Sequence, residues 1–271
     1  METEKKPITE FKFIDFHTHI FPEVVAQKAT DHVGAYYSLP MMGNGTEESL
    51  MFGQKDLNVA GFVMFSAAMN PLKTRSVNDF VKDRSANNPK IIGFASVHPD
   101  TPDLEGELNY ILSMNFHGLK LHPDFQQFNI DDERMYPVYD KLSGKLPILF
   151  HVGDQNSDMS SPKRLAKVMK LFPELTVIAA HMGGYSTWDL AEEYLVGTRA
   201  YFDTSNALLY IPDDELVSII RRHGSEKIFF GSDFPLRYTA DAAREFYRIH
   251  LSEKEFDDIF YNNAKKFLRL V

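Results

Sequence analysis

The 271-residue sequence contains no cysteine, which excludes disulfide bonds and zinc sites built from thiolates. A chain without thiols is compatible with a reducing compartment. The sequence also has no apolar run of membrane-spanning length, and its first ten residues lack the apolar core of a signal peptide. Together these absences predict a cytoplasmic protein that does not insert into a membrane.

An excess of basic residues is also missing, because 29 lysines and arginines face 38 aspartates and glutamates, for a net charge of −9. Phosphate backbones are bound by basic patches, so this composition argues against a nucleic-acid partner. It does not exclude an anionic small substrate, since one local arginine or a metal ion can reverse the local field. We expect a small-molecule substrate, and the composition is compatible with a homo-oligomer.

Short apolar runs alternate with longer amphipathic segments along the chain. The runs expected to form strands are 12–19, 60–66, 91–97, 117–122, 146–152, 175–181, 199–204 and 227–232. The segments expected to form helices are 46–57, 75–87, 103–114, 132–143, 161–171, 187–195, 212–222, 239–249, 252–261 and 263–269. Residues 32–45 are expected to be the longest irregular connection.

Eight strand-then-helix units are the number that a (β/α)₈ barrel requires. A doubly wound sheet would usually show a glycine-rich first turn, and no G-x-G-x-x-G motif follows the first strand. No linker or internal repeat divides the sequence. We therefore predict an α/β protein with one (β/α)₈ TIM-barrel domain over residues 1–271 and extra C-terminal helices.

Two histidines stand one residue apart at the end of the first apolar run, in the stretch FHTH. Residues i and i+2 of a strand point to the same face, so His17 and His19 would project side by side, with Thr18 turned away. Two imidazoles on one face can bind one metal ion. On this stretch alone, a pair of ordinary hydrogen-bonded histidines is an equally good interpretation.

Ionisable residues follow most of the other apolar runs as well. They are Lys120, His122, His151, His181, Asp203 and Asp233. In a barrel, the carboxyl ends of all strands meet at one mouth. Crowding these groups together without a shared cation would cost several kcal/mol in desolvation and repulsion. The pattern therefore favours a metal site over ordinary turn residues.

Six motifs in order, FHTH, HGLKLHPD, LFHVG, AHMGG, GSDFP and YNNAKKFLRL, resemble the amidohydrolase-related (amidohydrolase 2) branch of the amidohydrolase superfamily, whose members are metal-dependent (β/α)₈ enzymes. The resemblance implies four metal ligands, namely His17, His19, His151 and Asp233. Three imidazoles and a carboxylate suit Zn²⁺, with Mn²⁺ or Fe²⁺ as alternatives. His181 is similar to the histidine that carries a proton beside the metal site, a role that Asp233 could share.

Four further residues have two interpretations each. Lys120 could be carbamylated and bridge a second ion, or it could hold the substrate; we favour a single ion. His122 faces the same way as Lys120 and is a candidate bridge or substrate contact. Arg237 could clamp an anionic group or form a loop salt bridge, and His98 could line the mouth or belong to a structural turn.

The expected reaction is hydrolysis of a small-molecule amide, ester or lactone by water that a metal ion activates. The same ligands would also serve the non-oxidative decarboxylation of an aromatic or unsaturated acid. A third hypothesis is a non-catalytic barrel that keeps zinc for stability or binds a partner. His181 argues against this third hypothesis, because the fold alone gives no reason for it.

Overall fold

The computed structural model describes residues 6–270. The chain divides into two compact units. Unit 1 comprises Met1–Val63 and Thr204–Val271, and unit 2 comprises Met64–Asp203. The single domain predicted over residues 1–271 extends beyond the described residues. The first residues of the N-terminal segment, which was predicted to lack a signal peptide, also lie outside them.

Unit 2 is built on parallel strands that are buried along their length, except at Tyr201. They are β3 (Ile91–Ala95), β4 (Gly118–Leu121), β5 (Ile148–Phe150), β6 (Val177–Ala179) and β7 (Tyr201–Asp203). The register pairs Leu121 with Phe150, and Phe150 with Ala179. Strands covered on both faces read as continuous apolar runs, which explains why these segments lack an alternating pattern. The in-register pairing also places the carboxyl ends of β4, β5 and β6 at one edge.

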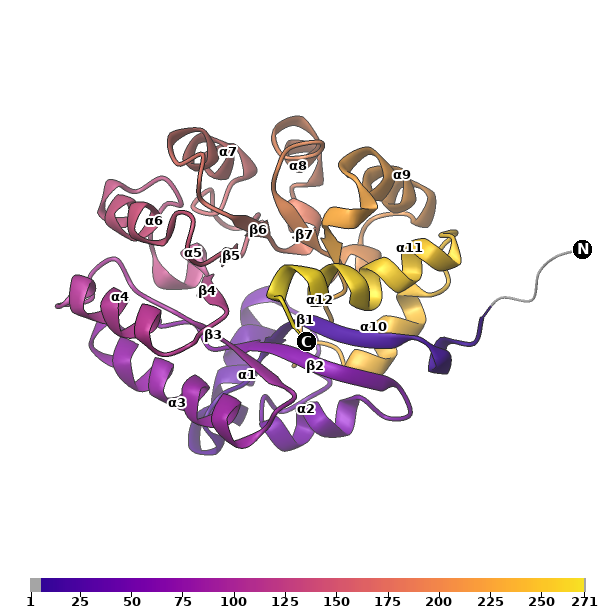
Figure 1. Ribbon diagram of the computed structural model, residues 1–271, viewed down its shortest axis with the longest axis horizontal. Coiled ribbons are helices and arrows are strands. Elements are labelled where there is room, and N and C mark those ends of the chain that lie inside the picture. The colour runs from indigo at the N-terminus through magenta and orange to yellow at the C-terminus, as the bar shows by residue number, and fades with distance from the viewer. Residues whose placement is uncertain (1–5, 271) are drawn as a thin grey trace, which may run out of the picture. The chain divides into compact units, whose positions relative to one another are not determined.

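The helices of unit 2 separate its strands along the chain. They are α3 (Thr74–Asn87), α4 (Leu104–Ser113), α5 (Pro123–Gln126), α6 (Tyr136–Leu142), α7 (Pro162–Leu171) and α8 (Trp188–Tyr194). Figure 1 shows α3, α4, α6 and α7 on the outer side of β3 to β6. Local signals start two of them: the Asp103 side chain accepts a hydrogen bond from the first turn of α4, and Pro162 occupies the first turn of α7.

Unit 1 contains β1 (Lys12–His19), most of β2 (Asn58–Phe65) and β8 (Ile228–Phe229). The Phe16 N–H donates to the carbonyl of Phe230 at 2.7 Å, and the Thr18 hydroxyl donates to the carbonyl of Val63 at 2.8 Å. β1 therefore lies between β2 and β8. Within unit 2, the strands β3 to β7 are paired in the order in which they occur along the chain.

The described residues of unit 1 also form six α-helices. They are α1 (Glu23–Tyr37), α2 (Glu47–Gly53), α9 (Asp213–His223), α10 (Thr239–Phe246), α11 (Glu253–Asp257) and α12 (Asn263–Leu268). The expectation that residues 32–45 are irregular is wrong for their first part, because α1 continues to Tyr37. Only Ala26 and Thr30 of this helix are buried, so its sequence carries little amphipathic signal. The helix ends where Ser38 adopts a left-handed conformation, with φ 55°.

An aromatic cluster packs β1 against β8 and against the C-terminal helical segment. Phe13 lies 4.5 Å from Phe260 between ring centroids, and Phe16 stacks on Phe229 at 4.1 Å. All four rings are buried. Burying one such side chain contributes about 1.5–3 kcal/mol, so the predicted C-terminal helices help to hold the strand that carries FHTH.

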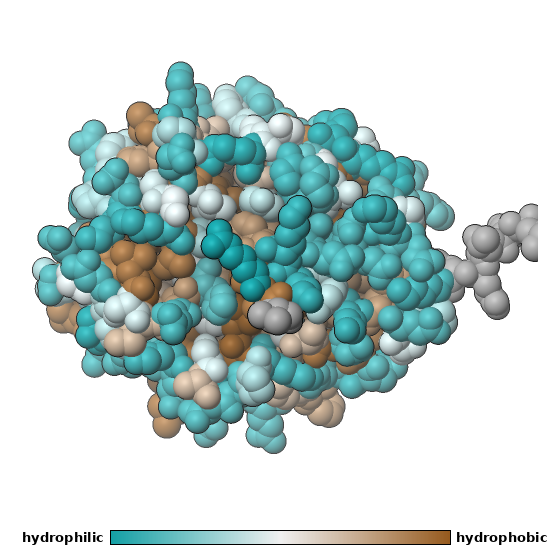
Figure 2. All heavy atoms as spheres, viewed as in Figure 1, coloured by the Kyte–Doolittle hydropathy of each residue, from teal (hydrophilic) through white to brown (hydrophobic). Residues whose placement is uncertain are grey.

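Hydrophilic side chains cover most of the face that Figure 2 displays. This agrees with a composition that is 25% charged. Within residues 6–270, none of the helices combines the length and the apolar character needed to cross a membrane.

The Glu255 carboxylate connects α11 to α9 and yields a prediction about stability and pH. It accepts hydrogen bonds from the backbone N–H of Ser252, at 2.7 Å, and from Arg221 Nε, at 3.1 Å. The Arg221 guanidinium, more than any other group, lowers the pKa of Glu255 from 4.5 to about 2. A lowered carboxyl pKa stabilises the fold above pH 4.5, and this stabilisation is lost as the pH falls from 4.5 through 2.

We expect Glu255→Gln to reduce the free energy of unfolding at pH 7 by about 1 kcal/mol, a value that allows for solvent screening of the exposed Arg221. The difference from wild type should shrink as the pH is lowered from 5 to 3, as followed by urea denaturation. Glu10→Gln, an exposed change, is the control. A difference that stays constant with pH would contradict this account.

Candidate functional site

Three side chains of unit 1 converge with the spacing that a metal ion requires. Nε2 of His17 lies 3.2 Å from Nε2 of His19 and 3.2 Å from Oδ1 of Asp233. The remaining side, from His19 Nε2 to Asp233 Oδ1, is 3.4 Å. Ligand atoms about 2.0–2.1 Å from one tetrahedral ion lie about 3.3 Å apart, so this donor set fits a divalent metal. We call these three residues the ligand triangle.

The backbone brings Asp233 next to the two histidines. The Asp233 N–H donates to the carbonyl of His17 at 2.9 Å, and the His19 N–H donates to the carbonyl of Phe234 at 2.7 Å. These bonds extend the pairing of β1 beyond the end of β8. Asp233 itself has a φ of 60°, in the left-handed region. Such conformations are unfavourable for residues other than glycine and concentrate at functional sites.

Asp15 holds the backbone of His17 next to the segment that leads to Asp233, although no sequence motif pointed to this residue. Its buried carboxylate accepts hydrogen bonds from the Ser232 N–H at 2.9 Å, the Thr239 hydroxyl at 2.7 Å and the His17 N–H at 3.3 Å. Burial raises the pKa of Asp15 from 3.8 to about 6, and these donors only partly oppose the rise. One carboxylate thus connects β1 to the residue that precedes Asp233.

Two more polar side chains support the ligand triangle, and both follow β7. The Ser205 hydroxyl lies 3.2 Å from Nδ1 of His17, and the Asn206 amide donates to Oδ2 of Asp233 at 2.5 Å. Such outer partners orient metal ligands. They occupy Nδ1 and Oδ2, so Nε2 of His17 and Oδ1 of Asp233 face the centre of the triangle. In the sequence, the polar run Asp203-Thr204-Ser205-Asn206 was the signal that could have identified Ser205 and Asn206 as site residues.

Unit 2 contains a separate pair of imidazoles at the ends of β5 and β6. Nδ1 of His151 lies 3.0 Å from Nε2 of His181. The His181 N–H donates to Oδ1 of Asp203 at 3.1 Å, and its carbonyl accepts the indole N–H of Trp188 at 3.0 Å. His181 has a φ of 57° and is buried. His151 and His181, two of the predicted site histidines of unit 2, therefore contact each other, and the bonds to Asp203 and Trp188 fix the backbone of His181.

A glycine allows the loops after β5 and β6 to approach each other. The Tyr185 N–H donates to the carbonyl of Val152 at 2.7 Å. Gly153 has a φ of 84°, and a Cβ atom there would lie 2.3 Å from the Tyr185 carbonyl oxygen. Any other residue would push the two loops apart, so Gly153 helps to fix His151 and His181.

His122 lies flat between two other rings of unit 2. Its ring centroid is 4.2 Å from that of Phe125, at 20° between planes, and 3.9 Å from that of His151, at 10°. Asp124 Oδ2 lies 4.0 Å from both His122 Nδ1 and His151 Nε2, and burial raises the pKa of Asp124. Lone pairs of stacked rings lie in parallel planes and cannot both reach an ion about 2 Å away. In this arrangement the group fits a metal less well than the ligand triangle does.

Two other predicted site residues of unit 2 have structural contacts. Lys120 is fully buried, and its Nζ lies 4.9 Å above the ring of Phe65. His98 Nδ1 accepts the backbone N–H of Asp100 at 3.1 Å, as in a turn, and burial lowers the pKa of His98. The turn interpretation of His98 therefore has a contact to support it.

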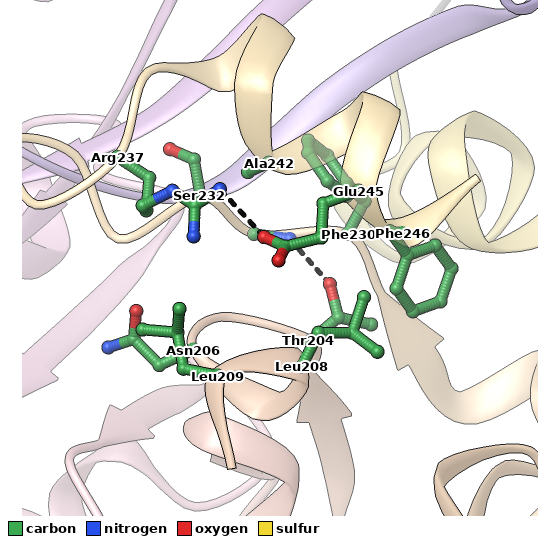
Figure 3. A pocket seen from close by; sticks show the side chains of 11 residues that line it. Thr204, Asn206, Leu208, Leu209, Phe230, Ser232, Arg237, Ala242, Glu245 and Phe246 are labelled. Carbon is green, nitrogen blue, oxygen red and sulfur yellow. Dashed lines mark hydrogen bonds and ion pairs between the residues drawn. The ribbon is translucent and has the colours of Figure 1, made fainter. Parts of the chain in front are cut away.

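A small cavity of unit 1 adjoins the segment that leads to Asp233. Its lining residues are Thr204, Asn206, Leu208, Leu209, Phe230, Gly231, Ser232, Arg237, Ala242, Glu245 and Phe246. Figure 3 shows the Arg237 guanidinium and Asn206 on facing sides of it. A guanidinium nitrogen of Arg237 lies 2.7 Å from a carboxylate oxygen of Glu245, so the salt bridge that the sequence left open is present.

The comparisons with known proteins identify the family and the fold. The model of the amidohydrolase family matches residues 14–270. None of the curated proteins searched matches the sequence.

Solved structures of low identity share the fold. A TIM-barrel protein of Bordetella bronchiseptica is 14% identical over 95% of this chain and 98% of its own, with a TM-score of 0.75. The 5-carboxyvanillate decarboxylase of Sphingomonas paucimobilis is 16% identical, with coverage of 97% and 100% and a TM-score of 0.72. The enzyme of that name from Novosphingobium aromaticivorans, solved with manganese and a nitrobenzoic acid, is 14% identical, with coverage of 97% and 97% and a TM-score of 0.71. The predicted (β/α)₈ TIM barrel is confirmed.

The contacts of Asp15 give the second prediction. Asp15→Ala should lower the free energy of unfolding by about 3 kcal/mol, because it leaves the N–H groups of Ser232 and His17 buried without an acceptor. It should also weaken metal binding at the ligand triangle. Asp15→Asn should cost less than about 1 kcal/mol, because the amide oxygen can accept from Ser232 and the Thr239 hydroxyl can turn to accept the amide N–H.

Denaturation curves and Mn²⁺ titrations of the two variants provide the measurement. Asp56→Asn, at an exposed aspartate, is the control and should resemble wild type. Equal losses of unfolding free energy and of metal affinity in the alanine and asparagine variants would show that the three hydrogen bonds do not maintain this geometry in solution.

Proposed function

The chain belongs to the amidohydrolase family, and we propose on this basis that it is a metal-dependent hydrolase of a small-molecule amide, ester or lactone. The observation that supports the proposal most strongly is the ligand triangle of His17, His19 and Asp233. Its sides of 3.2, 3.2 and 3.4 Å match the spacing of ligands around one ion. Ser205 and Asn206 complete it by orienting His17 and Asp233.

The family is metal-dependent, and we propose one divalent ion on the ligand triangle. Two imidazoles and a carboxylate suit Zn²⁺, while the manganese in solved relatives makes Mn²⁺ the alternative. His151 stays the predicted third imidazole ligand. When bound, the ion would polarise the substrate carbonyl and lower the pKa of a water molecule, so that this water could lose a proton and attack the carbonyl near neutral pH.

The residues of the chain would supply positioning and proton transfer. Asp233 points Oδ1 at the two imidazoles, as a ligand atom would, while Asn206 donates to Oδ2. We propose that the Asp233 carboxylate shares in taking a proton from the attacking water. His181 is proposed to deliver a proton to the leaving group, as an imidazole can near neutral pH. The contact between Ser205 and His17 Nδ1 would keep Nε2 of His17 directed at the ion.

Decarboxylation is the second candidate, because several structurally similar proteins are decarboxylases of aromatic acids. In that reaction the metal ion, together with Arg237 or Lys120, would hold the acid. In this chain Arg237 is paired with Glu245, and Lys120 is buried against Phe65. We therefore place hydrolysis first. Product analysis on a panel of esters, lactones, amides and aromatic acids separates the two reactions, since only decarboxylation releases CO₂. The cytoplasmic location and the homo-oligomer remain predictions.

Metal content gives the third prediction. The purified protein should hold about one equivalent of divalent metal, and His17→Ala should lose most of it because one of few ligand bonds disappears. His250→Ala, at an exposed histidine, should retain the wild-type content. Elemental analysis measures both. Two equivalents, together with added mass on Lys120, would overturn the single-ion proposal in favour of a carbamylated bridge.

The fourth prediction separates a ligand from a proton carrier. His181→Asn should keep its metal, because asparagine retains the size and part of the hydrogen bonding of the imidazole. Its kcat should nevertheless fall by roughly 10²–10⁴, the usual contribution of a positioned acid or base, with a changed pH–rate profile. His151→Asn should lose metal and activity together. If His181→Asn also loses the metal, His181 is a ligand and the proton transfer falls to Asp233.

A further inference from the structure

The cavity beside Asp233 has no net charge in its wall. Among the described residues that line it, only Arg237 and Glu245 are ionisable, and they neutralise each other across 2.7 Å. Their side chains are 22% and 25% exposed, so the pair is partly shielded from water. An anion entering the cavity would have to compete with Glu245 for Arg237, and a cation would have to compete with Arg237 for Glu245. The wall therefore favours an uncharged guest.

Asn206 gives this cavity a hydrogen-bond acceptor that none of the described residues uses. Its amide nitrogen donates to Asp233 Oδ2 at 2.5 Å, which fixes the orientation of the amide because a carboxylate accepts but does not donate. The other end, Oδ1, is buried, and within residues 6–270 it receives no hydrogen bond. Asn206 is 9% exposed and has a φ of 58°. A buried acceptor without a donor costs about 1–3 kcal/mol, so a ligand that donates to it would gain affinity.

The other polar atoms of the wall already accept backbone hydrogen bonds. The Thr204 hydroxyl oxygen accepts the Gly231 N–H at 3.2 Å, and the Ser232 hydroxyl oxygen accepts the Phe234 N–H at 3.1 Å. The rest of the lining is apolar and comprises Leu208, Leu209, Phe230, Ala242 and Phe246. Figure 3 shows the Asn206 oxygen pointing to the side of the cavity where the guanidinium lies.

We propose that this cavity is a substrate subsite for an uncharged group that carries an N–H or O–H donor on a small apolar body, such as a primary amide or an alcohol. The donor binds Oδ1 of Asn206, and the apolar body packs on Leu208, Ala242 and Phe246. The inference rests on the proposed function, because Asn206 contacts the subsite with one end of its amide and Asp233 with the other. It makes neutral polar compounds, rather than acids, the substrate class.

A matched pair of probes tests the donor. Butyramide and 2-pentanone have nearly the same shape and the same carbonyl, but only butyramide has N–H donors. Ligand-observed NMR titrations of the metal-loaded wild-type protein should give a Kd for butyramide roughly 3–10-fold lower than that for 2-pentanone, the range expected of one hydrogen bond to a buried acceptor. Equal dissociation constants would overturn the proposal.

Two variants locate the effect. Asn206→Leu removes the acceptor and should abolish the preference for butyramide. Ala242→Leu fills the cavity without touching Asp233, so it should weaken the binding of butyramide at least 5-fold while the metal content and the melting temperature stay those of wild type. A preference that survives in Asn206→Leu, or butyramide binding that is unchanged in Ala242→Leu, places the probe elsewhere and overturns the subsite.

Two further measurements separate this proposal from the proposed function. Butyrate should not bind in the cavity, so its affinity should be the same in wild type and Ala242→Leu; a loss in that variant would mean an anion site and overturn the neutral subsite. His17→Ala should keep the preference for butyramide after losing its metal. If wild type contains no metal but still prefers butyramide, the metal-dependent function fails and the subsite stands.

Discussion

The buried carboxylate of Asp15 is the interaction on which the geometry of the candidate metal site depends. Asp15 is a residue of β1, two positions before His17. It accepts hydrogen bonds from Ser232 and Thr239, which lie on the segment after β8. The two elements that supply the ligand triangle are therefore joined by one acceptor rather than by packing alone. Keeping a carboxylate at full burial is unfavourable, as its raised pKa of about 6 shows, and the three donors offset this only in part.

The sequence predicted the architecture because barrel strands carry a strong local signal. The predicted strand 12–19 has the bounds of β1, and the other seven are found within a few residues of their predicted positions. Helix α1 was missed because it exposes most of its surface and buries only Ala26 and Thr30, so no apolar stripe marks it. Periodicity detects an element through the face it buries, and an element with little buried surface escapes detection.

Part of the candidate site was predictable for the same reason and part was not. His17 and His19 follow from strand alternation, which fixes their common face within a single element. Asp15 and Ser205 act on residues about 190 to 220 positions away, and Asn206 acts on Asp233, which is 27 positions away. No local pattern encodes such contacts. The left-handed conformations of His181, Asn206 and Asp233 were equally hidden, since none of the three is a glycine.

Two histidine-rich groups among the described residues show why spacing decides more than composition. His122, Asp124 and His151 offer the same donor types as the ligand triangle, but two of their rings are stacked 3.9 Å apart with parallel planes. In the triangle the rings are inclined by 46°, and their Nε2 atoms approach to 3.2 Å. Lone pairs can converge on one ion only in the second case. Arg237, the cation among the described residues that line the adjoining cavity, lies 2.7 Å from Glu245, and this pairing supports our proposal of an uncharged substrate.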